Sequence, residues 1–411
     1  MSLKNMENIE ILSVEFLEDR RFCAVDISGP LARTENLDVP VLSWYNGRDR
    51  QLDMVHSLFY ADGRIDRREA INLLKSTRTD GVIRESEFIS LTEIFDNSEM
   101  PDYVRYLGSS VVDGSSSNTH FQGKPLGNLS PGSSSEHIQK LIDKWFLGKD
   151  YPETGTSPEQ NITYNLVRGD LFVDGVSGED IAQGKVGNCY LMNALMSLSS
   201  AEIDNSAIEK MFLDNNDGTW TVRFYDIKNN YVPHYVTVDR YLPTRSNRDS
   251  WFADFGSDYL EEENELWPAL AEKAYVQFST QIDGIRNVTT KNNYQSTDGG
   301  ITRDTIKSIV GHLIPWRKLD NKEQIIADLE HGYVFTISFS NHGWTITDYD
   351  RESDKFFIRN PWGYNHIEET WEDMGERGLH FKWIYKVSSV NTDHIEDYRS
   401  KIVFGNVAWL V

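Results

Sequence analysis

The sequence predicts an α+β fold in which a helix carrying a cysteine comes first and a β-rich segment carrying a histidine and an asparagine follows. Three observations predict it. Apolar residues recur with helical spacing after Cys189, polar and apolar residues alternate as in strands at 342–348 and 355–359, and residues 1 to about 112 form a separate region with repeated Asp-Gly turns. With 411 residues, 39% of them hydrophobic, the chain is long enough for two or three domains that each bury a core.

The charge of the chain limits its partners. There are 41 Lys and Arg against 64 Asp and Glu, a formal net charge of −23. This argues against binding to nucleic acid or anionic membranes, and permits a bound Ca²⁺ ion or a basic substrate, unless the charge serves mainly solubility. No apolar run reaches the roughly 18 residues of a membrane span, and no secretory signal opens the chain. We therefore expect a cytoplasmic protein, with Cys23 and Cys189 as free thiols.

The segment around Cys189 has the pattern of a loop that delivers a nucleophile to a helix. A glycine-rich stretch starts at Gln183, and the residues after Cys189 have the spacing of a buried helix that begins at the cysteine. A thiol there faces unpaired backbone N–H groups and the positive end of the helix dipole, and both favour the thiolate. Gln183 offers a side-chain donor for an oxyanion. The alternative is a buried structural cysteine.

A nucleophile needs a base, and two later residues fit that need. His342 opens one predicted strand, and Asn360 ends another that Pro361 and Gly363 cut off. If the strands are neighbours, the Asn360 side-chain oxygen accepts a proton from one imidazole nitrogen and aims the other at Cys189. A single histidine is more often a surface or core residue, but three matching pieces in order favour a catalytic set.

Five motifs in order along the chain resemble those of the calpain family of cysteine proteases. They are Gln-Gly-x-x-Gly-Asn-Cys-Tyr at 183–190, Val-Thr-Val-Asp-Arg-Tyr-Leu-Pro at 236–243, Glu-Leu-Trp-Pro-Ala-Leu-Ala-Glu-Lys-Ala-Tyr at 265–275, Asn-His-Gly-Trp at 341–344 and Arg-Asn-Pro-Trp-Gly at 359–363. The similarity covers roughly 165–390. The chain departs from the family's Gly-His-Ala-Tyr at Asn341, Gly343 and Trp344, which would change the cleft wall and leave the reacting groups in place.

The resemblance implies a papain-like core of two lobes. We expect a lobe with the cysteine at 137–290 and a lobe with the histidine and asparagine at 291–411, joined near 285–297. Helices are predicted at 264–279 and 321–331, and strands near 219–225, 231–238, 333–339, 342–348, 355–359 and 403–410. The resemblance also implies an endopeptidase that cuts flexible protein segments, with Trp362 covering the His342–Asn360 hydrogen bond.

The resemblance further implies regulation by calcium, since calpain lobes are aligned by bound Ca²⁺. In the cysteine lobe the matching ligands are two carbonyls and two carboxylates, those of Val173, Gly175, Asp180 and Glu265. Asp180 could instead serve as a helix cap. In the second lobe Asp373 matches one ligand, but His366 stands where the family has a glutamate. We therefore expect one calcium site and no organic cofactor.

The region before residue 113 contains two turns, at 61–69 and 79–87, with the Gly, Ile and Glu of an EF-hand loop. The other ligand positions do not fit, so we expect a small helical repeat with degenerate EF-hand-like turns. A Gly/Ser linker is predicted at 113–136, and a capped amphipathic helix follows Ser135. A regulatory helical module is favoured for 1–112 over a cleaved pro-segment, a substrate-recruiting module or an inert cap.

Two other functions fit parts of the pattern. A catalytically silent scaffold with the protease fold would explain the changed cleft wall. A transglutaminase uses a similar Cys–His pair, but usually orients its histidine with aspartate. We expect a monomeric peptidase that acts on proteins or peptides, with the bare protease core of a bacterial calpain-like protein and no C2 or penta-EF-hand domain.

Overall fold

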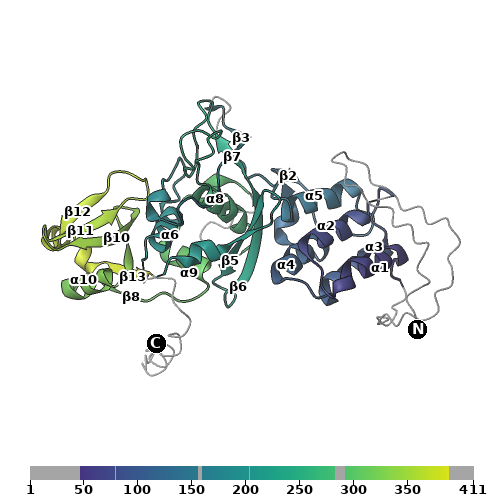
Figure 1. The fold of residues 1–411 in the computed structure, drawn as a ribbon, viewed down its shortest axis with the longest axis horizontal. Helices are drawn as coiled ribbons and strands as arrows, with labels where there is room; N and C mark the ends of the chain where they lie inside the picture. The colour runs from purple at the N-terminus through teal and green to yellow at the C-terminus, as the bar shows by residue number, and fades with distance from the viewer. Residues whose placement is uncertain (1–46, 79, 156–159, 203, 283–291, 388–411) are drawn as a thin grey trace, which may run out of the picture. The chain divides into compact units, whose positions relative to one another are not determined.

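The computed structural model describes residues 47–78, 80–155, 160–202, 204–282 and 292–387 (Figure 1). Some predictions lie wholly or partly outside these residues, among them the thiol state of Cys23, the strand at 403–410, most of the join at 285–297, and parts of the regions 1–112 and 291–411. Helices and strands mix through the described chain, as an α+β fold requires. None of the helices in the described part of the chain is long and apolar enough to cross a bilayer.

Five helices near the start of the described chain surround one apolar core, which includes Phe95 and Trp145. They are α1 (Arg50–Phe59), α2 (Arg67–Ser76), α3 (Glu85–Asn97), α4 (Asp102–Val112) and α5 (Ser135–Trp145). The amphipathic helix predicted after Ser135 is α5, but its cap is Ser134, whose hydroxyl accepts a hydrogen bond from the His137 N–H. The predicted linker contains a 3₁₀ turn, Ser116–Thr119, and two short paired strands, β1 (His120–Phe121) and β2 (Lys124–Pro125).

The two EF-hand-like turns serve as helix starts. Gly63 and Gly81 take φ values of +85° and +88°, which glycine adopts without the strain of a side chain. The glutamates that would be the last calcium ligands cap helices instead. The Glu69 carboxylate accepts from the Asp66 N–H at 2.8 Å, and the Glu87 carboxylate accepts from the Arg84 N–H at 2.8 Å.

The first part of the family match is built around α6 (Cys189–Ser199), and every residue from Tyr190 to Ser199 is buried. A helix that is apolar on all sides lies inside a core, and α6 lies among helices and strands on more than one side (Figure 1). Its neighbours include α7 (Ser206–Met211), α8 (Trp267–Phe278) and α9 (Thr302–Val310), with β4 (Phe212–Asp214), β5 (Thr219–Asp226) and β6 (Val232–Asp239) in one antiparallel sheet. A separate pair joins β3 (Thr163–Leu166) to β7 (Tyr241–Thr244).

The second part is a six-stranded antiparallel sheet in the order β12-β11-β10-β9-β13-β8. The strands are β8 (Trp316–Lys318), β9 (Val334–Phe339), β10 (His342–Asp350), β11 (Lys355–Arg359), β12 (Ile367–Thr370) and β13 (Trp383–Val387). Helices α10 (Lys322–Glu330) and α11 (Trp371–Glu376) accompany it. The helices predicted at 264–279 and 321–331 are confirmed as α8 and α10, and the five predicted strands inside the described residues are confirmed.

Candidate active site

Cys189 is the first residue of α6, as predicted, and its thiol is free and half-buried. The loop before it runs close to other backbone. A Cβ atom on Gly184 would lie 2.1 Å from the Phe252 carbonyl oxygen, so only glycine fits there. The loop therefore packs directly against the Phe252 backbone before it reaches Cys189.

Two carboxylates hold this loop from outside it. The buried Asn188 side chain donates to Glu272 Oε1 at 2.7 Å, and the Ala253 N–H donates to Glu272 Oε2 at 2.8 Å. The Gly187 N–H donates to Asp298 Oδ1 at 2.7 Å. Burial raises the pKa of Glu272 to about 7, although both hydrogen bonds work against the shift. The two residues before the thiol are thus positioned by carboxyl groups that are distant in sequence.

His342 and Asn360 lie at the ends of adjacent strands, β10 and β11, and their side chains meet. His342 Nε2 is 2.8 Å from Asn360 Oδ1, which also accepts the Trp362 N–H at 3.1 Å. Since the amide oxygen only accepts, Nε2 carries the proton and the neutral ring keeps its lone pair on Nδ1. In this tautomer Nδ1 is able to accept a proton.

Asn341 stands where the family has glycine, and the backbone conformation of the turn explains this substitution. Phe339 pairs with His342, so Ser340 and Asn341 form a two-residue hairpin turn with φ values of +52° and +57°. Both central residues of this turn type need positive φ, which asparagine tolerates better than most side chains. The family's glycine and this asparagine therefore meet the same requirement.

The loop after Asn360 turns back and hydrogen-bonds to the Asn360 backbone. The Gly363 N–H donates to the Asn360 carbonyl at 3.1 Å, and the Asn360 N–H donates to His366 Nδ1 at 3.0 Å. Burial and the Arg359 charge lower the pKa of His366, with Glu179 opposing them, which favours the neutral acceptor. The Trp362 ring lies 4.7 Å from the His342 ring and remains 41% exposed, so it covers one face of the imidazole only.

The Cys189 helix and the His342 strand are joined by buried polar contacts that the sequence interpretation missed. Thr345 Oγ1 donates to Asn193 Oδ1 at 2.6 Å and lies 2.8 Å from Ser197 Oγ. A Cβ atom on Gly343 would lie 3.1 Å from the Asn193 side chain, so the family's alanine would crowd this crossing. The available signal was Asn193 itself, an amide side chain in a helix whose other residues are mostly apolar or small.

Gln183 begins the loop that precedes Cys189, and its side-chain amide bonds to the backbone of that loop. Its Nε2 donates to the Val186 carbonyl at 2.7 Å, and its backbone N–H donates to the Pro361 carbonyl at 2.8 Å. The side-chain Oε1 is buried without a partner. The backbone contact ties the cysteine loop to the asparagine loop, while the side chain donates within its own loop.

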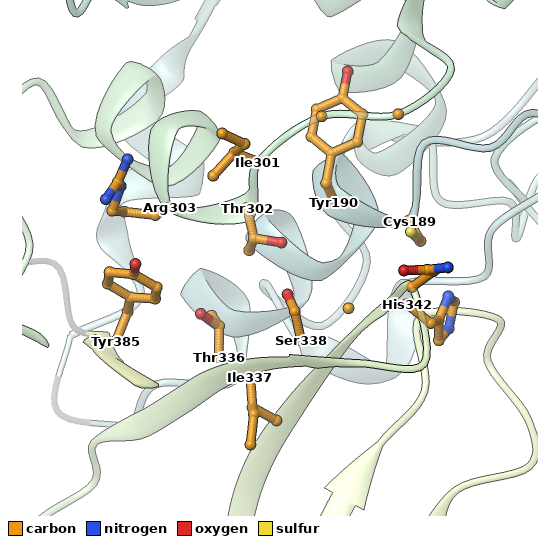
Figure 2. Close-up of a pocket in the computed structure, with 14 residues that line it drawn as sticks. Cys189, Tyr190, Ile301, Thr302, Arg303, Thr336, Ile337, Ser338, His342 and Tyr385 are labelled. Carbon is orange, nitrogen blue, oxygen red and sulfur yellow. The ribbon is translucent and has the colours of Figure 1, made fainter. Parts of the chain in front are cut away.

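Cys189 and His342 line one cavity of about 710 Å³. Figure 2 shows these two residues at one end and Arg303 with Tyr385 at the other, with Thr302 and Ser338 between them. The lining comes from the start of α6, the 299–303 segment, β9, the β9–β10 turn and β13. No described residue from 47 to 188 lines this cavity.

The four expected calcium ligands divide into a carboxylate pair and a nearby turn. Asp180 Oδ2 accepts from Trp267 Nε1 at 3.0 Å, and Glu265 Oε1 accepts from the Val173 N–H at 2.9 Å. Burial raises the pKa of Glu265 to about 7, with the charges of Asp180 and Asp174 adding to the shift, and burial also raises the pKa of Asp180.

Asp180 also closes a capping box with Ser177, as the third residue of the 3₁₀ turn rather than as its cap. Among the residues that the structure describes, no group of three or more His, Cys, Asp or Glu is placed to hold a metal. A bound ion would therefore need carbonyl or water oxygens beside the carboxylate pair.

Comparisons with known proteins identify the family of the chain. Residues 159–383, more than half of the chain, match the family model described as calpain family cysteine protease. Calpain-5 of Mus musculus is 32% identical over 151 residues, which are 34% of this chain and 20% of that protein. The calpain-1 catalytic subunit of Rattus norvegicus is 25% identical over 234 residues, 49% of this chain and 30% of that one.

The match over residues 159–383 places the chain in the class of cysteine peptidases. The family match makes this more specific: the chain belongs to the calpain family of cysteine proteases. It spans less than a third of the length of the relatives named above.

Proposed function

We propose that this chain is an endopeptidase that hydrolyses peptide bonds in flexible protein segments with Cys189, His342 and Asn360. One observation carries the proposal: the His342–Asn360 hydrogen bond of 2.8 Å engages Nε2 and leaves Nδ1 available, on a residue that lines the same cavity as Cys189. The family membership supports peptidase chemistry, and the position of each residue in its motif supports these roles.

In the proposed reaction, His342 Nδ1 takes the thiol proton and the Cys189 sulfur attacks the scissile carbonyl carbon. The tetrahedral intermediate collapses when His342 returns the proton to the leaving amine, which gives a thioester on Cys189. Water, deprotonated by the same imidazole, then hydrolyses the thioester and releases the second product. Asn360 holds the ring orientation through both steps, and Trp362 shields one side.

The oxyanion donors would be the Cys189 backbone N–H, at the open end of α6, and the Gln183 side chain. Gln183 Nε2 now donates to Val186, so its amide would have to turn toward the substrate oxygen. Substrate binding provides the acceptor for that movement. Gln183 is therefore proposed as a donor that the substrate recruits.

The two-lobed papain-like division is also a proposal, with 137–290 around Cys189 and 291–411 around the six-stranded sheet. The six-stranded sheet has an apolar core of its own, which supports this division, while the core around α6 also takes in Ile306, Ile309 and Val387 from beyond residue 291. For residues 1–112 we propose a regulatory module. Its helix α4 contacts β6 of the first part, where the Tyr106 hydroxyl lies 2.8 Å from His234 Nδ1.

Calcium is proposed at one site, held by the Asp180 and Glu265 carboxylates with the Val173 and Gly175 carbonyls. Two partly buried carboxylates whose pKa values burial raises are suited to a cation, because a divalent ion would replace the proton they otherwise retain. Calcium would supply charge neutralisation at this turn, and Trp267, bonded to Asp180, connects the turn to the first residue of α8.

The test is hydrolysis of unstructured casein by the full chain, with Ca²⁺ titrated against EGTA. Wild type and Cys23→Ala, a matched control for the other cysteine, should cleave; Cys189→Ala should lose at least about 10⁴-fold in rate. Calcium-dependent activity should weaken in Glu265→Gln. Equal cleavage by Cys189→Ala would reject the nucleophile, and activity that ignores EGTA would reject the calcium site. If wild type cleaves nothing with or without calcium, the proposal of an enzyme is rejected in favour of a catalytically silent scaffold.

A further inference from the structure

We propose that the end of the cavity away from Cys189 is a subsite for an acidic side chain, a glutamate or aspartate of the protein substrate. This rests on the proposed peptidase function and adds a substrate preference to it. The subsite consists of Arg303, the open N-terminus of α9 and the hydroxyls of Thr302, Thr336 and Ser338 (Figure 2). Each part offers hydrogen-bond donors, and their combined charge is positive.

The hydroxyls are the first part of the argument. Thr302 is 6% exposed and Thr336 is 2% exposed, and both residues line the cavity. On β9 the side chains alternate, so Thr336 and Ser338 face the cavity while the Ile337 side chain points away into the sheet core, as Figure 2 shows. A hydroxyl on a cavity wall can donate a hydrogen bond to a ligand oxygen, so these residues suit an acceptor group.

Arg303 supplies the charge. Its Nε donates to Asp304 Oδ1 at 2.9 Å, and its guanidinium lies 5.7 Å from the Tyr385 ring centre. Lys307 shares the same Asp304 oxygen at 3.5 Å, so two cations share one carboxylate and the local charge stays positive. The guanidinium fork matches the two oxygens of a carboxylate.

The helix end adds to this. Helix α9 begins at Thr302, and its N-cap, Ile301, has no side chain that could accept from the first N–H groups. Those groups and the positive end of the helix dipole favour an anion. They lie at the same cavity wall as Arg303, so the two contributions act on one ligand group.

No carboxylate of the described chain opposes an acidic ligand from the cavity wall, since the lining contains neither aspartate nor glutamate. Asp298, next to the lining residue Gly299, accepts from the Gly187 N–H instead. The net charge of −23 permits a basic substrate, but charges farther than about 10 Å are largely screened at ordinary salt. The groups in contact with the ligand therefore decide the preference.

The experiment measures binding to the full-length Cys189→Ala protein, so that no turnover is needed. Fluorescent peptides of one flexible sequence carry Glu, Gln, Leu or Lys at each position within four residues of the test bond, and anisotropy gives the dissociation constants. At one of these positions, the peptide with Glu should bind about tenfold more tightly than the peptides with Gln or Leu. Adding Arg303→Gln should remove this ratio, and Arg303→Glu should reverse it in favour of Lys. Arg351→Gln, the same charge change at an exposed arginine paired with Glu330, should leave the ratio intact.

The proposal is overturned if Leu binds as well as Glu at every position, if no peptide binds, or if Arg303→Gln keeps the full ratio. This binding result is independent of casein hydrolysis. A wild-type chain that binds Glu peptides selectively but cleaves nothing would reject the proposed function and leave the subsite in place.

Discussion

The two sides of the cavity are constructed by different means. His342 and Asn360 lie on neighbouring strands whose backbone register brings the side chains together, and the turn before His342 fixes where its strand begins. Cys189 follows a glycine-rich loop that side-chain carboxylates hold, those of Glu272 and Asp298. The backbone hydrogen bonds between strands do not change with pH, whereas a carboxyl group can gain or lose a proton. We therefore expect pH to affect the loop before Cys189 more than the strands that carry His342 and Asn360.

The largest effect is expected on the cysteine side. Gln183→Ala should lower kcat by roughly 10²–10³ with a smaller change in KM, because an oxyanion donor acts mainly in the transition state. Cleavage of a fluorogenic peptide measures this. A loss below about tenfold would mean that the side chain only braces its loop through Val186, and that the backbone N–H of Cys189 is the main donor.

A smaller effect is expected on the sheet side, at His366. His366→Leu leaves the Asn360 N–H without its acceptor and should lower kcat/KM about tenfold, the size of one lost hydrogen bond. His366→Asn should restore most of the rate, because the amide oxygen can replace Nδ1. It should also remove any loss of activity caused by protonation of His366, whose charged neighbours are Arg359 and Glu179. Equal rates for the Leu and Asn variants across the pH range would contradict this.

The smallest effect at neutral pH concerns the stability of the cysteine loop. Because burial raises the pKa of Glu272 to about 7, the folded protein holds this proton more tightly than the unfolded chain does. Its contribution to stability is therefore present in acid and lost as the pH rises from about 4.3 to about 7. As the pH rises through this window, the Tm of wild type should fall relative to the Tm of Glu272→Gln. Parallel Tm curves would show that Glu272 does not titrate there.

The sequence by itself determined the reacting groups and the elements that carry them. The start of the buried helix at Cys189 follows from apolar spacing, and the ends of the strands at His342 and Asn360 follow from alternation and from Pro361. The motif order identified the family before any geometry was known. These are local signals, because each depends on residues within one or two turns or strands of the site.

Only the tertiary structure decided which distant residues hold and surround the site. Glu272 reaches Asn188 across 84 residues, Asp298 reaches Gly187 across 111, and Thr345 reaches Asn193 across 152. The turn that brings Arg303 to the far end of the cavity likewise has no signature in its own segment. Contacts of this range depend on how the helices and sheets pack, and no periodicity or spacing along one segment records that packing.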